Sequence, residues 1–531
     1  MAGARQFDAL VVGAGISGLY MLKKLRDSGF SAQVIEAGSG VGGTWFWNRY
    51  PGARCDIPSM EYSYSFDPEL EQEWEWTERY AAQDEILRYL DHVADRYSLR
   101  DGIALNTRVT AAHWQDDGAR WLVQTDGAES YDAQFLILAT GALSEPKIPD
   151  LPGLENFEGD VLFTAKWDEA AELNGKKVCH FGTGSSGIQA VATMSEFVDQ
   201  LTVFQRTPSY AVPANNRPLE PGEQEEVKAS YQEMREVARH SPLGFATAPQ
   251  SGNAKEFAEA DREERLEGAW SAGTTGLLNA FEDLLFDEES NEHAAAFARR
   301  KIAASLDDPE KARKLTPNYP LGSRRLCSEI GFYDAINKPH VGLVDVREEP
   351  VTGFTANTVE TGAGSYPADA VVFATGFDAC IGAIKAIDLR GKGGQKITDE
   401  WADGPRAYLG LTVSGFPNMF AITGPGSPSV LSNVILSIEQ HVEWVARCLE
   451  DMRDAGKCVI EADGDAEQDW MKHVDEVAQM TLFPRADSWY MGRTRDGGQV
   501  FMPYVGGVGA YRAKCDEVAD GGYEGFHLQA G

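Results

Sequence analysis

The sequence has few cysteines, and none of them are neighbours. Seven cysteines are spread over 531 residues, and no two stand in C-x-x-C spacing. This spacing argues against a zinc site built from adjacent cysteines and against a redox dithiol, and it is typical of a protein from a reducing cytoplasm. We therefore expect no bound metal and a cytoplasmic location.

Long apolar runs and positive charge are also scarce. No apolar stretch approaches the roughly 18 residues that a membrane helix needs, and the chain enters an apolar segment at once, so we expect no signal peptide. The 48 Lys and Arg residues are outnumbered by 82 Asp and Glu residues, which gives a net charge of −34. Such acidity argues against nucleic acid and anionic membranes as partners and indicates a solvated acidic surface. The sequence does not indicate an oligomeric state.

What is present begins with a phosphate-binding turn near the N-terminus. An apolar strand is predicted over residues 7–12, and Gly13, Gly15 and Gly18 follow it in G-x-G-x-x-G spacing. An amphipathic helix and a second strand come next, and that strand ends at the acidic residue Glu36. This order is typical of a dinucleotide-binding fold, in which the helix N-terminus faces a pyrophosphate and the acid binds ribose hydroxyls. An ordinary glycine-rich turn is the alternative.

A second turn of the same kind follows in "KKVCHFGTGSSGIQAVATM". Gly182, Gly184 and Gly187 repeat the spacing, but the next strand, "QLTVFQ", ends at Arg206 and Thr207 instead of an acid. A cation and a hydroxyl suit a 2′-phosphate, so NADPH is favoured over NADH. The alternative is that Arg206 is a surface charge. The turn also contains further candidate phosphate contacts, namely Thr183, Ser185 and Ser186.

Two nucleotide folds in one chain predict an α/β protein with an FAD domain and an NADPH domain, both Rossmann-like. Two buried strands end in A-T-G, within residues 136–149 and 370–379, and such strands mark crossings between the two domains. Residues 214–314 are rich in Glu, Ala and Arg, which indicates a helical insertion. The predicted division is FAD domain 1–145 and 377–531, linker and NADPH domain 146–213 and 315–376, and helical insertion 214–314.

These motifs, together with "GGTWFWNRYPGARCD" (residues 42–56) and a linker that matches the form F-x-G-x-x-x-H-x-x-x-W except at the His, resemble the class I Baeyer–Villiger monooxygenases, most closely phenylacetone monooxygenase. The resemblance extends from about residue 7 to about residue 528. It implies that FAD, NADPH and O₂ convert a small ketone into an ester or lactone through a C4a-peroxyflavin. The substrate ketone and the regiochemistry are not implied.

The linker, "FEGDVLFTAKWD" (residues 157–168), departs from the family pattern at one position. Phe157, Gly159 and Trp167 match, but Phe163 stands where the family has His. The segment shows neither helical period nor strand alternation, so we expect an irregular linker. A phenyl ring cannot donate or accept the hydrogen bonds that an imidazole makes. We therefore expect Phe163 to be held by packing, buried between the two nucleotide domains near the first A-T-G crossing.

The resemblance assigns the chemistry to an arginine. Arg325 corresponds to the active-site arginine, Asp56 to its acidic partner, and Arg324 to a basic residue near the 2′-phosphate. A guanidinium is always charged and suits an oxyanion that forms beside the flavin. Without the resemblance, an Arg and an Asp this far apart in the sequence are more often surface residues.

Other positions carry over by the same resemblance. Trp489 matches a mobile-loop Trp that folds over NADP, or else it is a core Trp; the sequence after it, "MGRTRDGGQ", departs from the family's Asn and Pro-Gly-Lys turn. The remaining matches are FAD contacts at Thr44, Trp45, Phe46, Trp47, Asp56, Tyr62 and Val109, NADP contacts at Arg54, Cys55, Arg324 and Arg325, and a substrate-pocket bulge at Ser429, Val430 and Leu431.

Three alternative functions remain open. An N- or S-oxygenating flavin monooxygenase shares the cofactors but does not require Arg325 with Asp56. A flavoprotein disulfide reductase is disfavoured by the cysteine spacing. A non-enzymatic NADPH-binding regulator would be favoured if no ketone stimulated NADPH-driven O₂ consumption.

Overall fold

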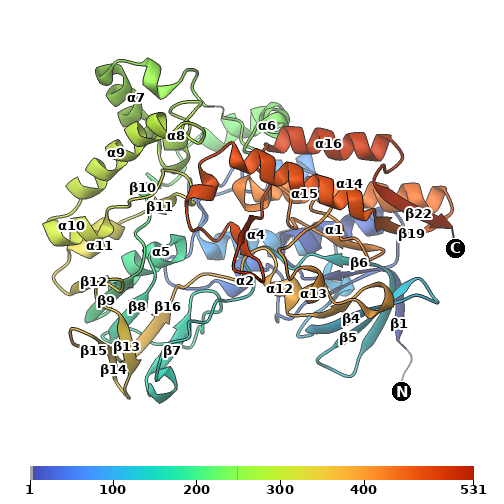
Figure 1. Cartoon of the computed structure of the whole chain (residues 1–531), viewed down its shortest axis with the longest axis horizontal. Coiled ribbons are helices and arrows are strands. Elements are labelled where there is room, and N and C mark those ends of the chain that lie inside the picture. The colour runs from blue at the N-terminus through green and yellow to red at the C-terminus, as the bar shows by residue number, and fades with distance from the viewer. Residues whose placement is uncertain (1–3, 248, 531) are drawn as a thin grey trace.

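The computed structural model describes residues 4–247 and 249–530. Figure 1 shows two sheet-containing regions, one around β1 (Arg5–Val12) and β6 (Ser130–Leu138) and one around β8 (Lys177–Phe181) and β9 (Gln200–Gln205), with a group of helices above the second. Each region contains a pair of parallel strands that flank a glycine turn in the sequence, so both motifs predicted from the sequence form part of a parallel arrangement.

The first sheet takes strands from both ends of the chain. Its order is β17-β4-β5-β6-β1-β2-β3, and β18 also pairs with β6. Its strands are β1 (Arg5–Val12), β2 (Ala32–Ile35), β3 (Ile103–Ala104), β4 (Val109–Gln115), β5 (Arg120–Thr125), β6 (Ser130–Leu138), β17 (Asp388–Arg390) and β18 (Met419–Ala421). The C-terminal strands β17 and β18 run parallel to β4 and β6. The C-terminal part of the chain therefore completes the sheet that the N-terminus begins.

Helices from both parts of the chain cover this sheet. Helix α1 (Ile16–Asp27) packs against α14 (Val434–Asp454), and α14 packs against α16 (Val508–Asp520). The apolar faces of these helices share one core cluster with residues of β1 and β6, among them Val11, Leu19, Ile137 and Val442. Other elements of this region are α2 (Thr44–Trp47), α3 (Pro68–Glu73), α4 (Gln83–Arg96), α12 (Gly382–Lys385), α13 (Ile397–Glu400), α15 (Gly464–Gln479), β19 (Lys457–Ala462), β20 (Met491–Arg493), β21 (Gln499–Phe501) and β22 (Phe526–Ala530).

The second sheet is parallel throughout, in the order β12-β9-β8-β16-β7. Its strands are β7 (Asp160–Phe163), β8 (Lys177–Phe181), β9 (Gln200–Gln205), β12 (Val341–Asp345) and β16 (Ala370–Phe373), and α5 (Ser185–Met194) and α11 (Phe332–Asn337) pack together beside it. A three-stranded antiparallel meander, β13 (Val351–Phe354), β14 (Thr358–Thr361) and β15 (Ser365–Pro367), follows β12.

The structure corrects the prediction for the linker. Residues 160–163 form β7, an edge strand parallel to β16, in which Phe163 pairs with Phe373. Phe163 is only partly buried, and its ring stacks on Phe373 with centroids 5.4 Å apart, in a cluster that includes Phe157 and Phe181. The expectation of burial between the two domains beside the first A-T-G was wrong. A four-residue edge strand gains its hydrogen bonds from its neighbour, so it needs no alternating pattern of its own.

Between the two sheets, the chain crosses twice in neighbouring segments joined by one isolated bridge. Pro146 and Phe377 form an antiparallel bridge, and the Lys147 and Asp378 amides donate to the Gly376 and Glu145 carbonyls at 2.9 Å. The two A-T-G segments, more than 200 residues apart in sequence, therefore run side by side. The exact domain limits remain a prediction.

The segment between the two halves of the second sheet is helical. It contains α6 (Glu223–His240), α7 (Glu259–Ala272), α8 (Thr274–Leu278), α9 (Glu288–Ala304) and α10 (Pro309–Leu315), and the parallel strands β10 (Ala211–Pro213) and β11 (Cys327–Glu329) pair at its base. Figure 1 shows α7 to α10 grouped beyond the second sheet, whereas α6 lies toward α16. Among the described residues, none of the helices has both the length and the apolar character that crossing a membrane requires.

Candidate active site

The first glycine turn has the geometry that a bound pyrophosphate requires. Gly13 adopts φ +105°, and a Cβ on Gly18 would lie 1.8 Å from the Gly13 carbonyl oxygen. Gly15 precedes α1 and brings no side chain to cap the amides of the first turn. Those amides are therefore free for an anion, which the helix dipole also favours.

Glu36 is held beside this turn. It follows β2 directly, is 5% exposed, and accepts hydrogen bonds from the Ala14 amide at 2.7 Å and the Gly38 amide at 2.6 Å, one on each carboxylate oxygen. Each oxygen keeps a second lone pair, so the carboxylate is oriented yet still able to accept ribose hydroxyls. An uncapped helix, a close-packed glycine turn and a fixed acid fit the diphosphate and ribose of FAD.

An aromatic segment follows in α2. The indole N–H of Trp45 donates to the Tyr62 hydroxyl at 3.1 Å, and both residues are buried. Burial raises the pKa of Tyr62, so the hydroxyl stays protonated. The Phe46 ring lies against the backbone at Gly38, next to Glu36. Trp47 meets the linker, because its carbonyl accepts a hydrogen bond from the Trp167 amide at 3.3 Å. Thr44 begins α2, and Val109 begins β4 and is buried.

The second turn repeats the first. Gly182 adopts φ +111°, a Cβ on Gly187 would lie 2.3 Å from the Gly182 carbonyl oxygen, and Gly184 leaves the N-terminus of α5 without a side-chain cap. Ser185 and Ser186 form the first turn of α5, and the Ser185 hydroxyl contacts the Cys327 sulfur at 3.6 Å. The same features that fit a diphosphate in the first turn are present here.

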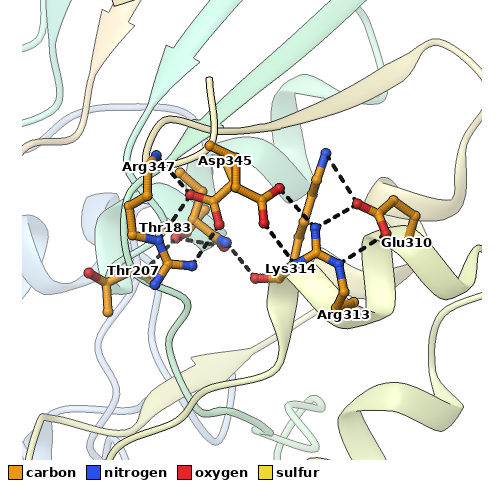
Figure 2. Close-up of polar contacts among 9 residues, drawn as sticks. Thr183, Thr207, Glu310, Arg313, Lys314, Asp345 and Arg347 are labelled. Atoms are coloured by element: carbon orange, nitrogen blue, oxygen red, sulfur yellow. Dashed lines mark hydrogen bonds and ion pairs between the residues drawn. The ribbon is translucent and has the colours of Figure 1, made fainter. Parts of the chain in front are cut away.

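Hydroxyls and cations gather where β9 and β12 end (Figure 2). The Thr183 hydroxyl lies within hydrogen-bond distance of two acceptors, the Gln205 side-chain oxygen at 3.2 Å and the Thr207 carbonyl at 3.3 Å. Arg206 is exposed at this strand end. Sequence reasoning did not single out two further residues here: Arg347, which donates to Asp345 at 2.6 and 3.0 Å, and Lys314, whose carbonyl accepts from Gln205 at 2.7 Å. The pairing of β12 with β9 brings Arg347 to this strand end, and helix α10 brings Lys314.

Arg325 and Asp56 meet in a bidentate ion pair. Arg325 Nε and Nη2 donate to the two Asp56 oxygens at 2.6 and 2.7 Å, and Nη1 donates to the Val430 carbonyl at 2.9 Å. The Arg325 and Asp56 side chains are 32% and 18% exposed. Burial alone would raise the pKa of Asp56, but the charge and hydrogen bonds of Arg325 outweigh it and hold that pKa below its usual value. The pair is therefore charged at neutral pH.

This arrangement leaves the guanidinium partly unused. A guanidinium has five N–H donors, and three are engaged by Asp56 and Val430. The two that remain belong to Nη1 and Nη2 and are available to an anionic oxygen. The structure therefore supplies a fixed cation with free donors, which is the chemistry that stabilises an oxyanion.

Arg324 points to the loop before Trp489. Its Nη2 donates to the Asp487 carbonyl, and its guanidinium lies 5.1 Å from the centre of the Tyr319 ring. Trp489 is partly buried, with its ring 4.4 Å from that of Tyr490. The divergent segment that follows forms an antiparallel hairpin of β20 and β21. Arg324 is thus placed beside the loop that carries Trp489.

Arg54 and Cys55 lie between the two nucleotide folds. Arg54 donates to the Glu78 carboxylate and the Tyr80 carbonyl, while its own carbonyl accepts from Gln189 of α5 at 3.1 Å. Cys55 is buried, and burial raises the pKa of its thiol. Nη1 of Arg54 is therefore held by protein partners, and the backbone of Arg54 contacts the helix that follows the second turn.

The predicted bulge follows a buried turn. Ser429, Val430 and Leu431 form a short 3₁₀ turn, in which Ser429 has φ +43°. Val430 contacts Arg325 through its carbonyl. Of the residues predicted from sequence, the structure thus unites Asp56, Arg325 and Val430, whereas Glu36 and Arg206 lie in the first and second nucleotide folds, respectively. The described residues hold no group of three His, Cys, Asp or Glu side chains suited to a metal ion.

Comparison with known proteins gives consistent similarities. A family model described as pyridine nucleotide-disulphide oxidoreductase matches residues 10–249, although all seven cysteines here are free thiols. The chain is 38% identical over 529 residues to phenazine N-monooxygenase PhzNO1 of Lysobacter antibioticus, covering 99% of this chain and 97% of that protein. It is also 38% identical over 522 residues to a Baeyer–Villiger monooxygenase of Pseudooceanicola batsensis, covering 97% and 95%.

Solved structures agree over the whole chain. A steroid monooxygenase bound to NADP has 45% sequence identity and a TM-score of 0.94, covering 99% of this chain and 100% of that one. A crystal structure of OTEMO in complex with FAD and NADP has 35% identity and a TM-score of 0.95, with 99% and 100% covered.

Proposed function

The chain belongs to the flavin monooxygenase family that includes the Baeyer–Villiger monooxygenases, and from this premise we propose that it uses FAD, NADPH and O₂ to insert one oxygen atom beside a ketone carbonyl, giving an ester or lactone. The observation that carries the proposal is the Arg325–Asp56 pair with its two free donors. No nucleic acid or membrane partner is part of it.

FAD would occupy the first nucleotide fold. The amides at the start of α1 would bind its diphosphate, and Glu36 would accept the ribose hydroxyls. Residues of α2, together with Tyr62 and Val109, would contact the flavin end of the cofactor. When bound and reduced, FAD supplies the activation of O₂.

NADPH would occupy the second nucleotide fold. The amides of Gly184, Ser185 and Ser186 would bind the diphosphate, and Arg206 and Thr207 would bind the 2′-phosphate. Arg324 would link the nucleotide to the loop of Trp489, because it already donates to the Asp487 carbonyl of that loop. Cys55 and the backbone of Arg54 would lie beside the nicotinamide half.

Arg325 would stabilise negative charge at the reacting oxygen and at the carbonyl oxygen of the ketone. Asp56 holds the guanidinium through two bonds, so its free N–H groups keep one direction and need little reorganisation during the reaction. Neither residue is required to move a proton, because the pair remains charged at neutral pH. The turn 429–431 would form the wall of the ketone site beside this cation.

A second function is favoured by one comparison. A relative of equal identity is named phenazine N-monooxygenase, so oxygen transfer to a heteroaromatic nitrogen is the alternative. That reaction does not need a cation that stabilises a carbonyl-derived oxyanion. The discriminating feature is therefore the importance of Arg325 for product formation.

The test is NADPH oxidation by the purified yellow protein with a panel of linear, cyclic and aryl ketones and with phenazine and quinoline as competing substrates. Esters or lactones heavier than the ketone by one oxygen are expected, identified by mass spectrometry. N-oxides without esters would support the alternative. No NADPH oxidation beyond the substrate-free rate with any compound would favour a nucleotide-binding regulator.

We also propose a cytoplasmic location. It is supported by the seven free cysteines, six of which are buried, because proteins of oxidising compartments commonly carry disulfides. Intact-mass analysis before and after alkylation of denatured protein from its native host checks it; seven alkylated thiols are expected.

A further inference from the structure

The turn that carries Val430 contains two unusual backbone conformations. Thr423 has φ +58° and Ser429 has φ +43°, in the left-handed region that residues with a Cβ rarely adopt. Such conformations are strained for residues with a Cβ and persist only where the surroundings fix them. We call residues 423–431 the bulge turn. Its shape needs a cause outside the turn itself.

His441 of α14 supplies a hydrogen-bond acceptor behind the bulge turn. Its side chain is fully buried, and its Nδ1 accepts from the Thr423 amide at 2.9 Å. An amide nitrogen can only donate, so Nδ1 must carry no proton. Burial lowers the pKa of His441 to about 3, so the ring is neutral near pH 7.

The other ring nitrogen settles the tautomer. In a neutral imidazole with an unprotonated Nδ1, the proton is on Nε2. Nε2 lies 2.7 Å from the hydroxyl of Tyr511 on α16, and that hydroxyl donates to the Leu409 carbonyl. Nε2–H therefore donates to the Tyr511 oxygen. All the polar groups of this buried chain are satisfied by one arrangement of protons.

The chain of contacts continues to the proposed cation. The Thr423 carbonyl accepts from the Ser429 hydroxyl at 3.3 Å, and the next residue, Val430, accepts from Arg325 Nη1 at 2.9 Å. His441 therefore reaches Arg325 through Thr423, Ser429 and Val430. An apolar side chain of similar size would fill the same space but would leave the Thr423 amide without an acceptor.

We infer that His441, oriented by Tyr511, is a positioning residue that fixes the bulge turn and thereby sets the ketone-binding wall and the third hydrogen bond of Arg325. This inference rests on the proposed function. It predicts that the side chain acts on binding and use of the ketone and leaves the reduction of FAD by NADPH unaffected, since the nucleotide turns lie on other elements.

The decisive variants are His441→Leu and His441→Asn. Leu removes the acceptor, whereas the Asn side-chain oxygen takes nearly the place of Nδ1. Leaving a buried amide unpaired is expected to raise KM for the ketone about tenfold and to lower the ester formed per NADPH consumed. The rate of FAD reduction should stay within about twofold, which is well below the tenfold effect of a lost hydrogen bond, and Asn should restore most of both ketone readouts. Unchanged ketone readouts in His441→Leu, or an equal loss of FAD reduction, would overturn the inference.

A readout independent of catalysis tests the tautomer. In protein labelled with ¹⁵N-histidine, the signals lost in His441→Asn identify this ring among nine histidines. An unprotonated Nδ1 and a protonated Nε2 are expected near pH 7; the opposite tautomer would overturn the inference. If the unmutated protein makes no ester, the proposed function fails but the tautomer result still stands.

Tyr511→Phe decides the matter if His441→Leu does not fold. Without the Tyr511 oxygen, Nε2–H has no acceptor, and a proton on Nδ1 would instead oppose the Thr423 amide, so either tautomer leaves a buried N–H group unpaired. A fall in ester formed per NADPH, smaller than that expected for His441→Leu, is predicted. A ratio equal to that of the unmutated protein would overturn the inference.

Discussion

Arg325 and Asp56 form a two-bond ion pair although 269 positions separate them in the chain. Asp56 ends the segment that follows α2, and Arg325 precedes β11 at the base of the helical insertion. The pair therefore links the segment after α2 to the base of the helical insertion, and we propose that the flavin and the nicotinamide meet beside it. Its geometry limits the guanidinium to one orientation, and the predictions below start from that limit.

Replacing Asp56 by Asn should reduce ester formation. The Asn amide offers one acceptor and places an N–H group against the guanidinium, so Arg325 loses both a charge partner and a hydrogen bond. Charge-assisted hydrogen bonds contribute about 1.5–3 kcal/mol, so kcat for the ketone should fall roughly tenfold or more, with FAD still bound. The measurement is product formation at equal flavin content.

A matched control is Glu169→Gln, which removes the exposed ion pair of Glu169 with Arg49. Exposed pairs contribute little, so this variant should keep the unmutated rate. An Asp56→Asn variant as active as Glu169→Gln would show that Asp56 does not orient the cation.

A methyl group on Gly18 should abolish FAD binding. The new Cβ would lie 1.8 Å from the Gly13 carbonyl oxygen, so the turn and the helix would have to separate. Gly268→Ala is the control, because nothing lies within 4 Å of that position in α7. We expect colourless or aggregated Gly18→Ala and yellow Gly268→Ala, read from the flavin absorbance. Full flavin content in Gly18→Ala would contradict the assignment of the first turn.

Arg206→Ala should narrow the preference for NADPH. A phosphate that loses a charge-assisted partner loses about 1.5–3 kcal/mol, so the ratio of kcat/KM for NADPH to that for NADH should fall roughly tenfold or more. Arg313→Ala is the control, since Arg313 is bonded to Glu310 (Figure 2) and to Glu348. Equal kcat/KM values for NADPH and NADH in the unmutated protein would contradict the assignment of Arg206 to the 2′-phosphate.

Glu439 should make stability depend on pH. This residue of α14 is 5% exposed and accepts from the amide and hydroxyl of Ser65. Burial raises its pKa to about 7, more than Ser65 and Arg235 lower it. The folded state then holds more protons than the unfolded state between about pH 5 and 7, so stability falls as pH rises there, with a slope of at most about 1.4 kcal/mol per pH unit.

Glu439→Gln should remove this slope. Its amide can accept from the Ser65 amide and donate to the Ser65 hydroxyl, so both contacts survive without a charge. Urea unfolding at pH 5, 6, 7 and 8 provides the measurement, and Glu450→Gln on the same helix is the control that should retain the slope. An identical pH dependence in both variants would be inconsistent with a Glu439 that titrates in this range.

The glycine turns and Glu36 were predictable because backbone constraints leave a local signature. Gly13 needs a positive φ, Gly18 needs the absence of a Cβ, and Glu36 needs only its position after β2. The ion pair of Arg325 and Asp56 is not local. Its identification depended on resemblance to a family, and its bidentate geometry and the contact with Val430 appear only in three dimensions.

Phe163 and His441 show where sequence reasoning failed. Phe163 lies on a short edge strand that forms by pairing with β16, and no pattern within residues 160–163 predicts this strand. His441 lies inside a helix, where a buried histidine has no distinctive spacing. Its partners, Thr423 and Tyr511, come from two other segments, so only the fold reveals the hydrogen-bond chain.

The central claim is that Arg325 is needed for oxygen insertion but not for the preceding reduction of FAD. Arg325→Ala and the unmutated protein are compared with the same ketone. The loss of flavin absorbance after NADPH addition measures FAD reduction, and mass spectrometry measures the ester formed. We expect flavin bleaching in both proteins, ester only in the unmutated one, and hydrogen peroxide instead of ester in Arg325→Ala. Ester formed by Arg325→Ala at a near-normal rate would contradict it.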